Sequence, residues 1–274
     1  MNVISKNETR KFWQSHPLGN YEIVSEQGSE QYFRQLDLIR CDSSRFSMPL
    51  YGFDNSRSKM VLDIGCGPGW LTFNYAKNGA DIFSLDFTFI AADMTRKNLQ
   101  SYNLKSKVAV ADAENLPFKD NSFEFICCDG VLHHTPDAAR GMAEIWRVLK
   151  PKSRALVSVY YKNWMLKKYT FPLTIRLMSF LRVWTPHGLN PKTIRKLSLD
   201  DFGRFYDGED NPLGKIYTEQ ECLKLFNENG FKILKKEIHY FPVRFLPFAK
   251  YLPKAAIKFL DNICGTMIYF ILEK

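Results

Sequence analysis

The sequence lacks any long hydrophobic run. None of its apolar stretches reaches the about 18 uninterrupted residues that a membrane-spanning helix needs. Residues 1–13 are polar and show no apolar core followed by a small-residue cleavage site, so we predict no secretory signal. The six cysteines show no C-x-x-C spacing, which argues against a disulfide framework and against a metal site. These absences predict a cytoplasmic protein with reduced, buried thiols.

Acidic residues are almost missing from one segment. Residues 151–200 hold ten Lys and Arg against the single acid Asp200, and so carry most of the net charge of +9. Positive charge concentrated in this way predicts a local partner surface rather than a generally basic protein. The remaining composition, 45% hydrophobic and 24% charged, is that of an ordinary globular chain with a full core.

From residue 60 the sequence alternates between short apolar strands and helices. The predicted strands are 60–64, 82–85, 108–111, 123–128 and 155–160, and the predicted helices between them are 70–78, 89–102 and 138–149. Repeated strand–helix units with apolar strands predict a parallel sheet covered on both faces. An earlier helix is predicted to begin after Ser29, its N-cap candidate. A later helix is predicted to begin at Thr218 with a capping box. The further predicted elements are a strand at 231–241, a helix at 249–262 and a strand at 266–273.

The strongest functional signal is a glycine-rich turn after the first predicted strand. Gly65, Gly67 and Gly69 alternate with other residues in the stretch 61–69. Alternating glycines let the backbone pass close to a ligand, and the helix that follows offers N–H donors to an anionic group. A tight structural turn is the alternative interpretation.

Acidic residues follow the next three strands. Asp86 ends the second strand, Asp112 the third and Asp129 the fourth. The carboxyl ends of parallel strands meet at one edge of a sheet, where ligands of open α/β folds bind. An acid after the second strand can accept hydrogen bonds from both hydroxyls of a ribose. It can also cap the next helix. An acid after the third strand can accept a hydrogen bond from the exocyclic amine of an adenine.

These segments, together with 112–118, 132–134 and 144–151, resemble the motif series of class I S-adenosylmethionine (SAM)-dependent methyltransferases. The ubiquinone/menaquinone-methyltransferase-like (type 11) group is the most similar. The likeness is close over residues 58–162 and holds only in outline over 217–274. It implies an α/β fold with a three-layer, Rossmann-like, seven-stranded and mostly parallel sheet, whose last strand is antiparallel. N-terminal helices and a helical insertion complete the expected fold.

The resemblance implies that SAM is the cofactor, and it implies a role for each matching residue. Asp63 and the glycines hold its amino-acid end, Asp86 the ribose, Asp112 and Ala113 the adenine, and Asp129 and Gly130 line the methionine side. The complete expected cofactor-binding set is Asp63, Gly65, Cys66, Gly67, Gly69, Asp86, Phe87, Asp112, Ala113, Asp129 and Gly130. NAD is disfavoured, because its fingerprint is G-x-G-x-x-G rather than G-x-G-x-G.

His133, His134 and Tyr160 are the candidate catalytic residues. The histidines follow the fourth strand, near the expected position of the methyl group, and an ordinary imidazole accepts protons near neutral pH. Tyr160 can offer a hydroxyl or an aromatic face to the sulfonium. Packing is the alternative role for all three residues, and no metal site is predicted.

Four regions are expected. Residues 1–57 form an N-terminal helical lid, 58–162 the SAM-binding core, 163–215 a basic, aromatic insertion acting as a substrate cap, and 216–274 the rest of the core sheet. The insertion would cover a small apolar or anionic substrate. It could instead dock an acidic carrier protein, a membrane surface or, less favoured, a nucleic acid, or it could be a solvated helix face.

The leading functional hypothesis is methyl transfer from SAM to a small-molecule acceptor. No Asn-Pro-Pro-Tyr-like motif follows the fourth strand, which argues against DNA adenine or protein glutamine as the acceptor. One alternative keeps the cofactor but has SAM cyclise and release methylthioadenosine. Another is a non-enzymatic, basic module that binds SAM or RNA.

Overall fold

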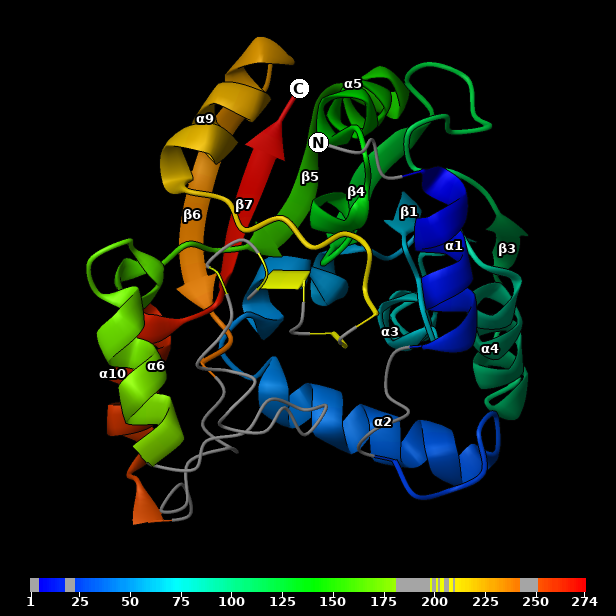
Figure 1. The fold of residues 1–274 in the computed structure, drawn as a ribbon. Coiled ribbons are helices and arrows are strands. Elements are labelled where there is room, and N and C mark those ends of the chain that lie inside the picture. Colours follow the sequence, from blue (N-terminus) through cyan, green and yellow to red (C-terminus); the bar gives the residue numbers. More distant parts are fainter. Residues whose placement is uncertain are drawn as a thin grey trace.

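One mixed sheet forms the centre of the computed structural model, which describes residues 5–17, 23–180, 198, 201, 203–204, 207–208, 210–241 and 251–274 (Figure 1). Its strands in this part of the chain are β1 Met60–Ile64, β2 Asp81–Asp86, β3 Lys107–Val110, β4 Phe123–Asp129, β5 Leu149–Tyr160, β6 Lys232–His239 and β7 Met267–Glu273. The order across the sheet is β3-β2-β1-β4-β5-β7-β6. Strands β1 to β5 pair in parallel, and β7 runs antiparallel to both of its neighbours. The predicted mostly parallel sheet with an antiparallel last strand is confirmed.

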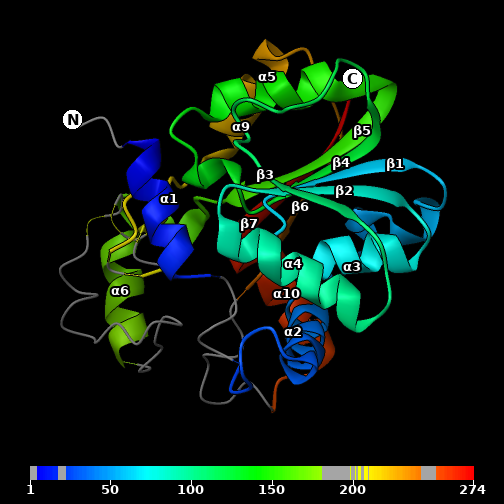
Figure 2. The same ribbon diagram turned by 90° about the vertical axis from the view of Figure 1, so that its right-hand side faces the viewer.

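Helices cover both faces of the sheet. The helices are α3 Trp70–Lys77, α4 Phe89–Ser101, α5 Ala138–Val148, α9 Glu219–Glu228 and α10 Lys254–Cys264. Figure 2 shows α5 and α9 on one face and α3, α4 and α10 on the other. The central strands are buried from both sides, and Leu62, Ile126 and Leu156 have no exposed surface. The three-layer arrangement therefore follows from strands that are apolar at almost every position.

Two N-terminal helices precede the sheet. Helix α1 (Lys6–Ser15) begins with a capping box between Ser5 and Glu8, and α2 (Glu30–Ser43) is capped by Ser29. Helix α2 packs on the α3 side of the sheet through Tyr32, Phe33 and Leu36, all of them buried.

Short 3-10 turns and one further helix complete the described elements. They are η1 Met48–Tyr51, η2 Phe53–Asn55, η3 Leu132–His134, η4 Trp164–Leu166 and α6 Phe171–Phe180. Helix α6 belongs to the expected insertion. The predicted insertion residues Trp184, Lys192, Lys196, Phe202, Phe205 and Tyr206 lie outside the described residues.

Most predicted elements lie within a few residues of their observed bounds, with one clear exception. Strand β5 starts at Leu149, not at residue 155, so the preceding helix is also one residue shorter than predicted. The added stretch, residues 150–154, is partly or fully exposed and polar, and therefore carries no apolar strand pattern. Sheet pairing, which joins Leu149 to Phe123, extends the strand regardless of that pattern.

The described residues contain no helix long and apolar enough to cross a membrane. All six cysteines are free thiols. Five of them are buried as expected, but Cys41 on α2 is exposed, so the prediction of buried thiols is wrong at that position.

Candidate cofactor and active site

The glycine-rich loop joins β1 to α3 and is packed too tightly for a side chain at Gly65 and at Gly69. Gly65 and Gly69 have φ values of 73° and 83°, in the left-handed region that favours glycine. A Cβ atom on Gly65 would lie 2.3 Å from a methyl of Val131, and one on Gly69 would lie 2.9 Å from the Cα of Thr95. The loop therefore sits directly against the segment that follows β4 and against α4.

Asp86 braces this loop from the end of β2. Its Oδ2 accepts a hydrogen bond from the Gly67 N–H at 3.0 Å, and its Oδ1 accepts from both the N–H and the hydroxyl of Thr88 at 2.9 Å. Thr88 in turn caps α4. Burial raises the pKa of Asp86, although these hydrogen bonds oppose the rise. Asp86 thus supports Thr88 and also lines the pocket described below. The alternative prediction that Asp86 itself caps the helix is wrong, because Thr88 is the cap.

Asp112, at the end of β3, meets a residue that the sequence did not point to. The Lys6 Nζ atom of α1 lies 2.5 Å from Asp112 Oδ2 and 2.6 Å from Glu114 Oε2. Burial opposes the charge on Lys6, but these two carboxylates outweigh it and raise the pKa of Lys6. Glu114 is itself buried, so Lys6 neutralises two acids at the same edge of the sheet.

Asp129, at the end of β4, is held from several elements. Ser158 on β5 donates to its Oδ1 at 2.5 Å, while Tyr51 and Arg40 donate to its Oδ2 at 3.0 and 3.1 Å. The Arg40 guanidinium also lies over the Trp70 ring, 5.0 Å from its centroid. This network fixes the end of β4 and orients the Gly130 N–H that follows it.

Asp63, on β1 behind the glycine loop, is fully buried. Its Oδ2 accepts a hydrogen bond from Thr72 at 2.7 Å, but its Oδ1 has no partner among the described residues. Burial raises its pKa to about 7, with the charges of Asp129 and Asp86 adding to the rise and the Thr72 bond opposing it. A buried carboxylate with a free oxygen is suited to pair with a cationic N–H group.

The three candidate catalytic residues converge beside a fourth residue that was not predicted. The Tyr160 hydroxyl donates to Asp207 at 2.8 Å, and His134 Nε2 lies 3.3 Å from the same carboxylate. His134 Nδ1 lies 2.7 Å from the Leu213 carbonyl oxygen. Burial raises the pKa of Asp207, against the opposing effect of His134. The rim of the site is therefore tied to Asp207 and Leu213 of the expected insertion.

His133 lies deeper than His134. Its ring lies against the Tyr160 ring with centroids 3.8 Å apart and the planes tilted by 34°, and its Nδ1 has no partner among the described residues. Burial, together with neighbouring His134, lowers its pKa well below the ordinary value. His133 is therefore a neutral imidazole at physiological pH.

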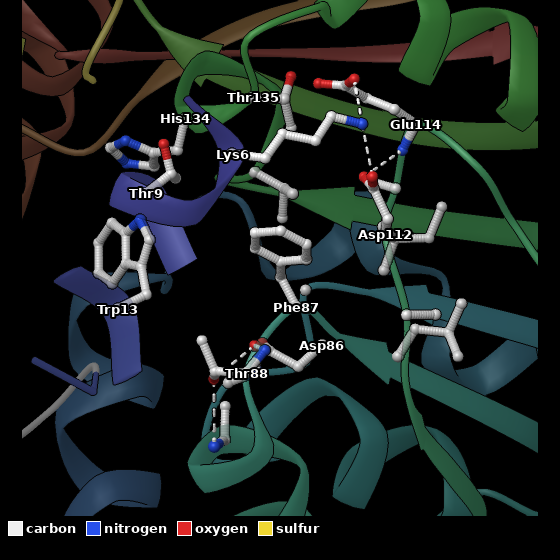
Figure 3. Close-up of a pocket in the computed structure, with 18 of the residues that line it drawn as sticks. Lys6, Thr9, Trp13, Asp86, Phe87, Thr88, Asp112, Glu114, His134 and Thr135 are labelled. Carbon is white, nitrogen blue, oxygen red and sulfur yellow. Dashed lines mark hydrogen bonds and ion pairs between the residues drawn. The ribbon is translucent and has the colours of Figure 1, made fainter. Parts of the chain in front are cut away.

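One pocket unites these strand ends (Figure 3). It encloses about 850 Å³ of empty space, open solvent included. Of the predicted site residues, those that line it are Gly65, Gly67, Asp86, Phe87, Asp112, Ala113, Gly130 and His134. The other predicted residues are not part of this lining; they are Asp63, Cys66, Gly69, Asp129, His133 and Tyr160.

Helix α1 forms the outer wall of the pocket through Lys6, Thr9 and Trp13. None of these residues was predicted, nor were Arg40, Tyr51, Ser158 and Asp207. In the sequence, the capping pattern of Ser5 and Glu8 marks where a helix begins. It does not show which part of the core that helix contacts. Within the described residues, no cluster of three His, Cys, Asp or Glu side chains could hold a metal ion.

The strand order, the antiparallel β7 and the glycine loop at the carboxyl edge of the sheet define the class I methyltransferase fold. Residues 62–157 match a family described as "Methyltransferase domain". This part of the chain therefore matches a methyltransferase domain, as the sequence motifs implied.

Similar curated proteins include an uncharacterized protein and several named methyltransferases. An uncharacterized protein of Methanocaldococcus jannaschii is 30% identical over 160 residues, which is 58% of this chain and 62% of that protein. A demethylmenaquinone methyltransferase of Lactobacillus johnsonii is 35% identical over 99 residues, 34% of this chain and 41% of its own length. The matched segments thus span about half the length of these curated relatives.

A solved structure of magnesium protoporphyrin IX methyltransferase from Synechocystis, with bound S-adenosylhomocysteine (SAH), shares the fold over the whole chain. The TM-score is 0.61 at 14% identity, with 98% of this chain and 100% of that chain covered. At this identity the likeness concerns the fold alone.

Proposed function

We propose that the protein binds SAM in the pocket at the ends of β1 to β4 and transfers its methyl group to a small-molecule acceptor. The observation that carries the proposal is one pocket lined by Asp86, Asp112 and the glycine-rich loop, with buried Asp63 on the strand that leads into that loop. SAM supplies an activated methyl group on a sulfonium, so the protein's task is to bind and align the two reactants.

The free oxygen of Asp63 fits the amino-acid end of this cofactor. A buried carboxylate oxygen without a hydrogen bond is costly, and an α-ammonium group would pair with it directly or through water. The raised pKa of Asp63 has the same origin, because the buried charge has too few partners. An ammonium at this position would restore the ordinary, ionised state.

The adenosine would lie between Asp86 and Asp112. Asp86 Oδ1 already accepts two hydrogen bonds from Thr88, but Oδ2 accepts only one, from Gly67, and has a lone pair left for a ribose hydroxyl. Phe87 offers a ring, and Ala113 a small side chain, at the edge where the adenine would lie. Gly65 and Gly67 allow the methionine part to approach the backbone.

The candidate catalytic residues divide into two kinds. Both ring nitrogens of His134 face acceptor oxygens, so we propose that His134 and Tyr160 hold the Asp207 segment in place. His133 keeps Nδ1 unpaired among the described residues, but burial lowers its pKa and so disfavours the protonated ring, which makes His133 a weak base. A catalytic role remains a prediction for all three residues.

The acceptor would approach from the side of the insertion. Helix α6 exposes Leu173, Leu177 and Phe180, and the described stretch 163–180 carries Lys and Arg without any acid. We propose an apolar or anionic acceptor, reached in solution, on an acidic carrier or from an anionic membrane surface. The quinone and porphyrin methyltransferases among the similar proteins support an apolar or anionic ring acceptor.

Product analysis with isotope-labelled SAM tests the proposal. Incubation with quinol, phenol and porphyrin acceptors should yield SAH and a labelled methylated product. Methylthioadenosine without SAH would favour cyclisation of SAM instead. Failure of the pure, folded chain to bind either SAM or SAH in titration calorimetry would reject the cofactor site. RNA binding that weakens steeply with salt would then favour the non-enzymatic alternative.

A further inference from the structure

One face of α1 is directed into the pocket. Lys6, Thr9 and Trp13 follow one another at spacings of three and four residues, which places them on the same side of the helix. All three line the pocket, and Figure 3 shows them in a row along its outer wall. They reach over the sheet edge from a segment that resemblance to the core motifs does not cover.

This helix is fixed to the core on both sides of Thr9. At one end, Lys6 contacts Asp112 and Glu114 after β3. At the other end, the Trp13 ring meets the His134 ring edge-on with centroids 4.8 Å apart, and Gln14 accepts a hydrogen bond from the Phe89 N–H at 3.1 Å. Thr9 therefore lies between the adenine end of the pocket and its methyl-transfer end.

The Thr9 hydroxyl has no hydrogen-bond partner among the described residues, although Thr9 is only 4% exposed. The backbone carbonyl one turn earlier, on Ser5, already accepts from the N–H groups of Glu8 and Thr9. A buried hydroxyl without a partner costs free energy, and valine would fill the same space without that cost. A threonine in this position makes sense if a bound molecule supplies the missing partner.

We propose that Thr9 is a cofactor-binding residue, whose hydroxyl hydrogen-bonds the adenosyl part of the ligand when α1 closes the pocket. The assignment rests on the proposed function, because it takes SAM or SAH as the ligand. Lys6 carries the adjoining task of holding α1 against Glu114 and Asp112. The helix is then part of the cofactor site itself and not only a cover over it.

Two variants of the full chain separate this role from simple packing. Thr9→Val keeps the shape of the side chain and removes the hydroxyl, whereas Thr9→Ser keeps the hydroxyl and removes a methyl group. Titration calorimetry with SAH measures the ligand contact, and the melting temperature without ligand measures the packing. Neither measurement requires the methyl acceptor to be known.

We expect Thr9→Val to weaken SAH binding about tenfold while its unliganded melting temperature stays equal to or above that of the wild type. Thr9→Ser should bind SAH within about threefold of the wild type. Wild-type affinity in Thr9→Val would overturn the proposal, and so would weaker binding accompanied by a lower melting temperature in both variants. Absence of SAH binding in the wild-type chain would instead reject the proposed function.

Discussion

The Lys6 ammonium and the Asp112 carboxylate, 106 positions apart in the chain, lie 2.5 Å from each other and join the first helix to the end of β3. The same ammonium contacts buried Glu114 at 2.6 Å. Without Lys6, two carboxylates would face each other at the sheet edge without a counter-ion. The contact therefore holds α1 over the pocket.

Replacing Lys6 by methionine should loosen α1 and weaken SAH binding about fivefold, which is about 1 kcal/mol. The expected loss of affinity is modest because Lys6 is partly exposed and water screens its ion pair with Asp112. Titration calorimetry measures the effect, and limited proteolysis should show faster cleavage near α1. Lys11→Met, on the exposed side of the same helix, is the matched control. Equal affinity in the two variants would contradict the role of Lys6.

Asp86→Asn should weaken SAH binding at least tenfold, or about 1.4 kcal/mol, because the amide keeps one acceptor oxygen in place of two. In the proposed complex the replaced oxygen would accept a hydrogen bond from the ribose, and it already accepts one from Gly67 or Thr88. A slightly lower melting temperature should therefore accompany the weaker binding. Calorimetric titration against Asp93→Asn, which alters an α4 ion pair with Lys97, provides the comparison. An unchanged dissociation constant would remove Asp86 from the site.

Affinity for SAH should rise as the pH increases through about 7. Burial holds the pKa of Asp63 at about 7 in the free protein, so a fraction of this carboxyl is protonated at neutral pH. A bound ammonium favours the ionised form, and binding should therefore release protons near pH 7. Titrations in buffers with different ionisation enthalpies count these protons. The release should vanish in Asp63→Asn, and a wild-type titration without proton release would refute the pairing.

His239 should stabilise the fold most strongly on the acidic side of neutrality. Its ring lies 2.7 Å from both Asp261 on α10 and Glu237 on β6, and these carboxylates outweigh burial and raise its pKa. A raised folded-state pKa gives stability that is fully present below the unfolded value of about 6.5 and is lost as the pH rises through the folded value.

Melting temperatures measured between pH 6 and 9 test this expectation. The wild type should lose stability relative to His239→Gln as the pH increases above about 6.5. Parallel pH profiles of the two proteins would show that the pKa of His239 does not differ between the folded and the unfolded state, and would contradict the prediction.

The sheet and the glycine loop could be predicted because their signals are local. The central strands contain short apolar runs, and Gly65, Gly67 and Gly69 lie within one turn of chain. The outer part of the site could not be predicted in this way. Arg40 meets Asp129 across 89 positions, and Tyr160 meets Asp207 across 47, so no periodicity links the partners. Such pairs are set by how the helices pack, which single-residue patterns do not encode.

The predicted histidines illustrate a second limit. Their position after β4 was read correctly, but their hydrogen-bonding state depends on residues from another region. The Leu213 carbonyl and Asp207 face the two nitrogens of His134, while His133 Nδ1 faces no partner among the described residues. Sequence alone treats the two rings as equivalent, and only their surroundings distinguish them.

Strand β7 has a consequence for how the chain is made. It fills the gap between β5 and β6 although it is synthesised after both. While the ribosome still covers residues 267–273, β6 and the α9 helix that precedes it have no neighbouring strand to join. A nascent chain released before this point would lose two strands of its sheet, and its β5 would be left as an open, aggregation-prone edge.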